Sequence, residues 1–385
     1  MHKFLLGNKT GIHPDASHEY HALTSVVYWG KLFPVTIYRM RFSLSQIPSC
    51  HWHDAYPKSK PLQVQKRNAQ INGLNATYVK SIHYDMSLHT AEDSNKTYKT
   101  KLVTLSTAPG TDENIVTGYY IQHSKEPSSK VVLWLYGGAF LSGDSQSNLN
   151  LSEKMGQECN YTDIFIPNYR LLPENTFFDA LFDVCLAYEY LVVVKKFNPK
   201  DITLFGISSG GGLVVRLLQR IVEFQKEISS QNGGINSCTD IKESSMLQIV
   251  PSGAVLMCPF VDYTEPKGSF LEYTKHDLIV NESVFEEGTP YFSTLGSDEI
   301  RYNESPVYRS LEGLPPLCVV VSQHECVFDM NLLLVNKARK AGVDVTLGLW
   351  NYMCHVWPMF SAFVPEARQA VDFMSNWMKV NSFEE

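Results

Sequence analysis

A serine between two glycines follows a short apolar run and precedes a helical pattern. The sequence GISSG, residues 206–210, comes directly after the β-like run 202–205. A serine nucleophile needs this strand–turn–helix setting, because the tight turn exposes its hydroxyl and leaves no room for side chains two residues before or after it. Only Ser208 has glycines at both offsets, since Ile207 stands where Ser209 would need one. The spacing therefore predicts Ser208 as the nucleophile of an acyl-transfer reaction.

The alternative for this stretch is a glycine-rich turn that binds a phosphate. Neither G-x-G-x-x-G nor G-x-x-x-x-G-K-[ST] fits, because the glycines at 210–212 run into Leu213 and Val214 without a lysine. The nucleophile is therefore the preferred interpretation.

Two adjacent glycines upstream provide a second part of such a site. Gly137 and Gly138 follow the fully apolar run 131–135. Acyl transfer places negative charge on the substrate's carbonyl oxygen, and backbone N–H groups stabilise it where glycines allow a close approach. We expect the N–H groups of Gly137, Gly138 and Ser209, the residue after the nucleophile, to form this oxyanion hole.

The general base and its acid are expected after later strands of the sheet. His355 follows the last β-like run, 343–350, and both Glu325 and Asp329 follow the run 317–321. A carboxylate there would fix the imidazole tautomer and stabilise the imidazolium. Serine, acid and histidine would then follow one another in the chain order typical of α/β hydrolases.

β-like and helical patterns alternate from about residue 101 onwards and would position these residues. Continuous apolar runs between helices predict an α/β fold with a mostly parallel central sheet that helices cover on both faces. The segment 225–245 is polar and predicts a surface excursion, and 261–316 predicts loops and short helices. The β-like runs are 101–107, 115–122, 131–135, 162–167, 202–205, 253–258, 317–321 and 343–349, and the helical patterns are 177–197, 211–224, 332–341 and 364–380.

Several ordered motifs resemble the hormone-sensitive-lipase-like branch of the α/β-hydrolase family. Residues 169–174 match its Tyr-Arg-Leu-x-Pro-Glu, 305–306 match its Ser-Pro, and 314–316 match its Leu-Pro-Pro. The match runs from about Val131 to the C-terminus. This resemblance implies the α/β-hydrolase fold and the hydrolysis of esters.

The same resemblance separates the two acids and implies a domain division. The family's Asp-x-Leu-x-Asp aligns Glu325 with its catalytic first acid, which leaves Asp329 as the alternative. It also implies an N-terminal cap over residues 1–100, with a contribution from 261–316, and a catalytic domain over 101–385. Such a cap favours a hydrophobic substrate.

Four positions depart from that family's motifs. In its His-Gly-Gly-Gly, Tyr136 replaces the histidine and Ala139 replaces the third glycine, and Ile207 and Ser209 replace the Asp and Ala around the nucleophile. A tyrosine hydroxyl can take over the orienting role of the imidazole, and the Ala139 methyl would narrow the pocket wall. The N–H groups of both remaining glycines are retained, so the oxyanion hole is still expected.

These features predict a serine carboxylic-ester hydrolase that acts on a lipophilic ester through an acyl-enzyme, without a cofactor. The long N-terminal extension and the glycosylation sequons resemble the fungal steryl acetyl hydrolases of this branch, which implies steryl or similar acetates as substrates. One alternative is an amidase or lactonase with the same apparatus. Another is a catalytically silent small-molecule receptor, against which His355 argues, because the receptors of this branch lack that histidine.

Composition and charge exclude other classes of protein. The chain of 385 residues carries a net charge of −7 and no concentrated basic run, which excludes a nucleic-acid binder. Its eight cysteines include no Cys-x-x-Cys pair and no Cys/His cluster with zinc spacing, so no metal site is expected. Cys185 and Cys258 lie in apolar runs and are expected to be buried free thiols.

Localisation is indicated by N-x-[ST] sequons and one apolar segment. The surplus of sequons favours an endoplasmic-reticulum or otherwise lumenal location, with the cytoplasm as the alternative. The segment Leu23–Ile37 is interrupted by Gly30, Lys31 and Pro34, so it is too short to span a bilayer and predicts a cap helix or a contact with a membrane surface. The seven sequons begin at Asn8, Asn75, Asn95, Asn150, Asn160, Asn281 and Asn303.

Overall fold

The computed structural model describes residues 83–85, 99–106, 116–122, 128–160, 162–230, 249–264, 266–275, 277–280 and 294–383. Nearly all of the predicted N-terminal cap, including the segment Leu23–Ile37, lies outside these ranges. The sequons at Asn8, Asn75, Asn95 and Asn281 lie outside them as well.

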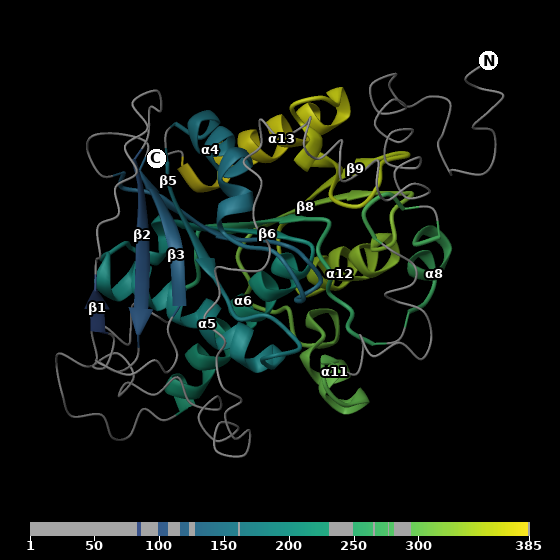
Figure 1. Ribbon diagram of the computed structural model, residues 1–385. Helices are drawn as coiled ribbons and strands as arrows, with labels where there is room; N and C mark the ends of the chain where they lie inside the picture. Colours follow the sequence, from purple (N-terminus) through teal and green to yellow (C-terminus); the bar gives the residue numbers. More distant parts are fainter. Residues whose placement is uncertain are drawn as a thin grey trace.

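A nine-stranded sheet forms the centre of the described molecule (Figure 1). Its strands follow the order β1-β2-β3-β5-β4-β6-β7-β8-β9. The strands from β5 to β9 pair in parallel, and β1, β2 and β3 form an antiparallel edge. The strands are β1 His83–Asp85, β2 Lys99–Ser106, β3 Val116–Gln122, β4 Val131–Leu135, β5 Asp163–Asn168, β6 Ile202–Ile207, β7 Gly253–Met257, β8 Leu317–Ser322 and β9 Val345–Trp350.

Helices cover both faces of this sheet. Helices α4 and α13 lie on one face, and α5, α6 and α12 lie on the other (Figure 1). The predicted α/β class with a mostly parallel sheet is therefore confirmed. The helices are α4 Leu149–Glu158, α5 Phe177–Glu189 with a π-helical turn η4 Tyr190–Val194, α6 Ser209–Ser230, α8 Ser269–Tyr273, α11 Asp298–Glu304, α12 Phe328–Lys340, and α13 Pro365–Met378 with a π-helical turn η8 Lys379–Phe383.

The central strands are buried on both faces. Every residue of β4, β6, β7 and β8 is buried, as is typical of parallel strands between two helical layers. Across neighbouring strands, the Trp134 ring stacks on Phe205 with ring centroids 3.8 Å apart. Because parallel strands end at the same edge, this rigid sheet brings the loops after β4, β6, β7, β8 and β9 together.

Helix α6 differs from its predicted bounds at both ends. It begins at Ser209 rather than Gly211, directly after β6, and it continues to Ser230. The expected surface excursion from residue 225 is therefore wrong for residues 225–230, which are helical. Gln, Lys and Glu are good helix formers, so a polar stretch can extend an amphipathic helix.

One region contains a strand that the sequence patterns did not reveal, and another contains the short helices that they predicted. Strand β1 lies within the range predicted as cap, and it pairs with β2 so that His83 lies opposite Ser106. The segment 261–316 contains α8, α11 and a 3-10 turn, Pro306–Tyr308, in its described part. No helix among the described residues is long and apolar enough to cross a membrane.

Candidate active site

Ser208 occupies the turn between β6 and α6 in a left-handed backbone conformation, with φ of +51°. Its N–H donates to the carbonyl of Met257 at 2.9 Å, and its own carbonyl accepts from the N–H groups of Phe260 at 2.9 Å and Gly212 at 3.2 Å. A non-glycine residue in this region costs about 1–3 kcal/mol and persists only where its surroundings enforce it. The three hydrogen bonds hold the Ser208 backbone in this conformation.

The glycines on either side of this turn are required by close packing. A β-carbon at Gly206 would lie 2.6 Å from the Cα of Gly211, and one at Gly210 would lie 2.2 Å from the carbonyl oxygen of Tyr136. Both distances are shorter than real carbon contacts allow. Strand β6 therefore packs closely against helix α6, and helix α6 packs closely against the end of β4. The turn between β6 and α6 is sharp as a result, and it presents the Ser208 hydroxyl.

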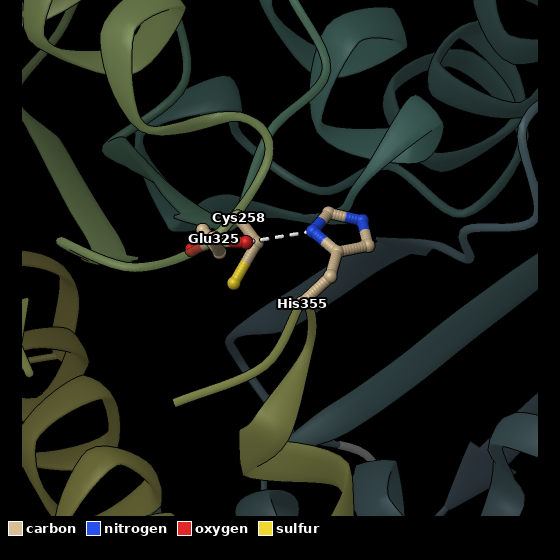
Figure 2. Close-up of side chains that lie close together, drawn as sticks. All are labelled: Cys258, Glu325 and His355. Carbon is tan, nitrogen blue, oxygen red and sulfur yellow. Dashed lines mark hydrogen bonds and ion pairs between the residues drawn. The ribbon is translucent and has the colours of Figure 1, made fainter. Parts of the chain in front are cut away.

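His355 is hydrogen-bonded to Ser208 on one side and to Glu325 on the other. Its Nε2 lies 2.8 Å from the Ser208 Oγ. Its Nδ1 lies 2.7 Å from the Glu325 Oε2, and Figure 2 shows this second contact. Because an ionised carboxylate only accepts, Nδ1 carries the proton, and Nε2 is left to accept the hydroxyl proton. The loops after β9 and β8 supply the histidine and the glutamate.

Glu325 is fully buried and has further donors. Its Oε1 accepts the N–H of Ser322 at 2.8 Å. Burial raises the pKa of Glu325, and hydrogen bonds from His355, Ser322 and Cys258 oppose that rise. These donors favour the ionised carboxylate that the imidazole needs as a partner.

Asp329, the alternative acid, faces a different element. Its Oδ2 accepts the N–H of Ser269 at 2.8 Å, and its own N–H donates to the Ser269 Oγ at 2.9 Å. These bonds join the first turn of α12 to the start of α8. The fold thus brings Glu325, and not Asp329, to His355.

The predicted oxyanion residues surround Ser208. A β-carbon at Gly137 would lie 3.0 Å from the Cβ of Ser208, so the loop after β4 passes directly beside the nucleophile. Ser209 is buried at the start of α6, and its Oγ accepts the N–H of Phe140 at 3.3 Å. Gly138 has a φ of +135° that favours glycine.

Ala139 replaces the family's third glycine at a strained position. Its φ is +55°, and that of Phe140 is +60°, so two consecutive non-glycine residues are left-handed. Phe140 is fully buried, and its ring packs edge-on against Phe177 at 5.6 Å and Tyr263 at 5.5 Å. This aromatic anchor holds the loop in its shape.

Tyr136 and Tyr169 form a buried pair next to the loop after β4 that carries Gly137 and Gly138, which we call the oxyanion loop. Their rings stack with centroids 4.4 Å apart, the Tyr169 hydroxyl donates to the Tyr136 carbonyl at 2.6 Å, and the Tyr136 hydroxyl donates to the Tyr169 carbonyl at 3.3 Å. A tyrosine thus contributes orienting hydrogen bonds where the family has histidine. The pair fixes the chain immediately before Gly137.

The segment that carries Tyr169 is itself anchored to α5. Arg170 forms a bidentate pair with the buried Asp183 at 2.8 and 2.7 Å and contacts Asp179 at 3.0 Å. The N–H of Leu172 donates to the carbonyl of Phe140 at 2.9 Å. The motif at 169–174 therefore connects the oxyanion loop to helix α5 and fixes its position.

Two residues near the histidine were not found from the sequence. Asp277 accepts the backbone N–H of His355 at 2.8 Å with one oxygen, and the N–H groups of Ile279 and Val280 at 2.8 and 3.0 Å with the other. No motif marks it. Cys258 directly follows β7, at the sheet edge where Ser208 lies, and that position was an available signal.

Six cysteines of the described chain are free and buried, as was expected for Cys185 and Cys258. The Sγ of Cys258, a Glu325 carboxylate oxygen and a His355 ring nitrogen lie within 4.8 Å of one another. The Glu325 and His355 atoms are only 2.7 Å apart. An ion with about 2.0 Å bonds to nitrogen and oxygen needs more room between them, so this geometry fits a hydrogen bond rather than a metal centre.

The chain is similar in sequence and fold to known proteins. Residues 132–359 match the family described by the α/β-hydrolase fold. An esterase of Acinetobacter venetianus is 28% identical, over 63% of this chain and 73% of the relative. An acetyl-hydrolase of Streptomyces hygroscopicus is 26% identical, over 65% of this chain and 75% of the relative.

A solved structure shares the fold. The crystal structure of an esterase from the bacterial hormone-sensitive lipase family superposes with a TM-score of 0.60 at 23% identity, over 85% of this chain and 93% of that one. The chain belongs to the α/β-hydrolase fold family. Within it, the predicted carboxylic ester hydrolase is confirmed.

Proposed function

We propose that this carboxylic ester hydrolase uses Ser208 as its nucleophile, His355 as its general base and Glu325 as its acid. One observation carries the proposal, namely the unbroken chain of hydrogen bonds from the Ser208 Oγ through His355 to Glu325, at 2.8 and 2.7 Å. The strained turn that presents Ser208 adds to it. Both features are what an activated serine requires.

In the first half-reaction, the Ser208 oxygen attacks the ester carbonyl carbon while His355 Nε2 takes the hydroxyl proton. Negative charge develops on the carbonyl oxygen, where the N–H groups of Gly137, Gly138 and Ser209 stabilise it. The intermediate then expels the alcohol, to which His355 returns the proton, and an acyl-enzyme remains.

In the second half-reaction, a water molecule replaces the alcohol. His355 takes a proton from the attacking water, and the same N–H groups hold the second oxyanion. Collapse releases the carboxylic acid and returns the proton to Ser208. During both halves Glu325 holds the imidazole tautomer and stabilises the imidazolium, while its own proton count stays unchanged.

The proposed substrate is an acetate ester of a lipophilic alcohol, such as a steryl acetate. The Ala139 methyl beside the oxyanion loop, at φ of +55° where the family has glycine, favours a short acyl group. The relative named as an acetyl-hydrolase is consistent with this choice. A hydrophobic alcohol is expected from the aromatic-rich N-terminal segment.

A fluorophosphonate probe tests the nucleophile directly. The wild-type enzyme should be labelled, and Ser208→Ala should be neither labelled nor active on p-nitrophenyl acetate. An unlabelled but folded wild type would refute the serine mechanism. A chain-length series of p-nitrophenyl esters, then steryl acetates against matched amides and lactones, tests the substrate, and faster amide or lactone turnover would replace the ester proposal.

We further propose a lumenal location for the protein. Three sequon asparagines, Asn150, Asn160 and Asn303, are among the described residues, and all three are exposed. An exposed asparagine is accessible to the glycosylation machinery. Peptide-N-glycosidase treatment of the protein from its native host should increase its electrophoretic mobility, and an unchanged mobility would favour the cytoplasm.

A further inference from the structure

Cys258 lies at the carboxyl end of β7, next to the strand that leads to Ser208. It is fully buried, its φ is +48°, and its N–H donates to the carbonyl of Val320 at 2.8 Å. The left-handed backbone turns its side chain away from the regular strand geometry. The residue is therefore held in an uncommon conformation beside the candidate active site.

The thiol of Cys258 faces the Glu325 carboxylate. Figure 2 shows the two side chains next to each other, beside His355. The carboxylate already accepts from His355 Nδ1 at 2.7 Å and from the Ser322 N–H at 2.8 Å. A carboxylate has about four acceptor sites, so a third donor can bind. The Cys258 Sγ lies within 4.8 Å of a Glu325 carboxylate oxygen, so the thiol is placed to be that donor.

The titratable groups around Glu325 leave Cys258 as a neutral donor. Burial and the nearby Glu325 charge raise the pKa of the Cys258 thiol well above its usual value. Cys354 and Cys326 are also buried there, and burial likewise raises the pKa of Cys326. The carboxylate of Asp277 is turned to the backbone of His355.

We propose that Cys258 is a positioning residue of the esterase site, whose thiol hydrogen bond holds the Glu325 carboxylate ionised and directed at His355. This inference rests on the proposed function, since it assigns a role through Glu325. A thiol donates weakly, yet a fully buried carboxylate has no water to replace a lost donor. Packing alone would not require a donor at this position.

Loss of the donor should act through protonation of Glu325. Without the thiol, burial is opposed by fewer hydrogen bonds, so the pKa of Glu325 rises further and the carboxylate protonates at a higher pH. The acid limb of the kcat profile should therefore move upward by about half to one pH unit in Cys258→Ala. The KM should stay unchanged, because Cys258 does not contact substrate.

The experiment measures kcat and KM for p-nitrophenyl acetate from about pH 5 to about pH 9 in the full chain. Cys258→Ser keeps a donor and should retain the acid limb within a few tenths of a pH unit. Cys318→Ala is the matched control, because Cys318 is equally buried on the adjacent β8 and lies at the start of that strand, whereas Glu325 follows its end. Cys318→Ala should have a lower melting temperature than the wild type, and the acid limb of its kcat profile should stay at the wild-type pH.

Equal acid limbs in Cys258→Ala, Cys318→Ala and wild type would overturn the proposal. Fluorophosphonate labelling of the wild type separates this outcome from failure of the proposed function, because an unlabelled wild type refutes the serine mechanism itself. If Cys258→Ala does not fold, the downfield proton resonance of His355 Nδ1–H is compared between wild type and Cys258→Val, which fills a similar volume without a donor. A shifted resonance supports the thiol hydrogen bond, and an identical one refutes it.

Discussion

Glu325, in the loop after β8, and Asp329, in the first turn of α12, are close in sequence, yet their surroundings separate their roles. Glu325 is fully buried against His355, and Asp329 is bonded to Ser269. We expect Glu325→Gln to lower kcat by about three to four orders of magnitude, because an amide cannot hold the same imidazole tautomer. Steady-state hydrolysis of p-nitrophenyl acetate measures this loss.

Asp329→Asn is the matched control for that change. It weakens the junction between α12 and α8, so it should lower the melting temperature and leave kcat within about threefold of the wild type. The opposite pattern, a large loss of kcat in Asp329→Asn and a small one in Glu325→Gln, would contradict the assignment of the acid.

At the scale of single residues, the sequence predicted those that a motif marks. Glycine spacing, a steric requirement, points to Ser208, and an ordered motif favours Glu325 over Asp329. The structure brings both side chains to His355. Asp277 could not be identified, since its role depends on the path of an irregular segment with no periodic pattern. Cys258 was read only as a buried thiol, because burial follows from composition and hydrogen bonding does not.

At the scale of elements, the oxyanion loop depends on the segment 169–174. We expect Tyr169→Phe to lower kcat about tenfold and leave KM nearly unchanged, because it removes the 2.6 Å bond that fixes the Tyr136 carbonyl before Gly137. The free energy of unfolding should fall by about 1–3 kcal/mol. Kinetics and urea unfolding measure the two effects.

Tyr120→Phe provides the comparison for that variant. Its buried hydroxyl donates to Asp163 at 2.9 Å on the antiparallel side of the sheet, so the same atom is removed far from the loop. A similar loss of stability with wild-type kcat is expected. If both variants lose activity equally, the effect is general destabilisation and not a loss of loop geometry.

A second element-scale prediction concerns the His355 loop and the segment 277–280. Asp277 joins the two through three backbone N–H groups. Asp277→Ala should lower kcat by up to about a hundredfold, because a displacement of about 1 Å of a catalytic group has an effect of this size. The rate of fluorophosphonate labelling should fall in parallel.

Asp262→Ala tests whether any buried loop aspartate has this effect. Asp262 accepts the N–H of Thr264 at 3.0 Å and pairs with Lys267, with no bond to His355. Asp262→Ala should lower the free energy of unfolding and leave the rate of fluorophosphonate labelling unchanged. Unchanged labelling in Asp277→Ala would show that the histidine loop holds its position without that carboxylate.

The larger elements were predicted more accurately than their ends. Apolar periodicity located the parallel strands and the covering helices, because burial on both faces leaves a continuous signal. The end of α6 was missed, since polar helix formers in residues 225–230 carry no such signal. Strand β1 was missed because three residues on an antiparallel edge are too few for a pattern.

At the scale of the whole molecule, Glu189 predicts how stability depends on pH. It is buried at the end of α5, and burial raises its pKa to about 7. Between about pH 4.5 and 7 the folded state keeps a proton that the unfolded state releases, so the free energy of unfolding falls as pH rises through this range. The full loss is on the order of 3 kcal/mol.

Glu189→Gln should remove that dependence. The variant should be more stable than the wild type at about pH 8 and nearly equal at about pH 5, as measured by urea unfolding at both values. The exposed Glu299, changed to Gln, should leave the pH slope as in the wild type. A wild-type slope in Glu189→Gln would mean that Glu189 is solvated or paired in the folded state.

The left-handed turn at Ser208 has an evolutionary consequence. At φ of +51°, glycine would occupy this position without strain, so random substitution toward glycine would stabilise the fold as it removed the hydroxyl. A substitution that abolishes activity at this position would thus also relieve strain in the fold. A serine at this position indicates that selection has acted on its chemistry, and descendants freed from that selection would tend to become more stable proteins that bind esters without cleaving them.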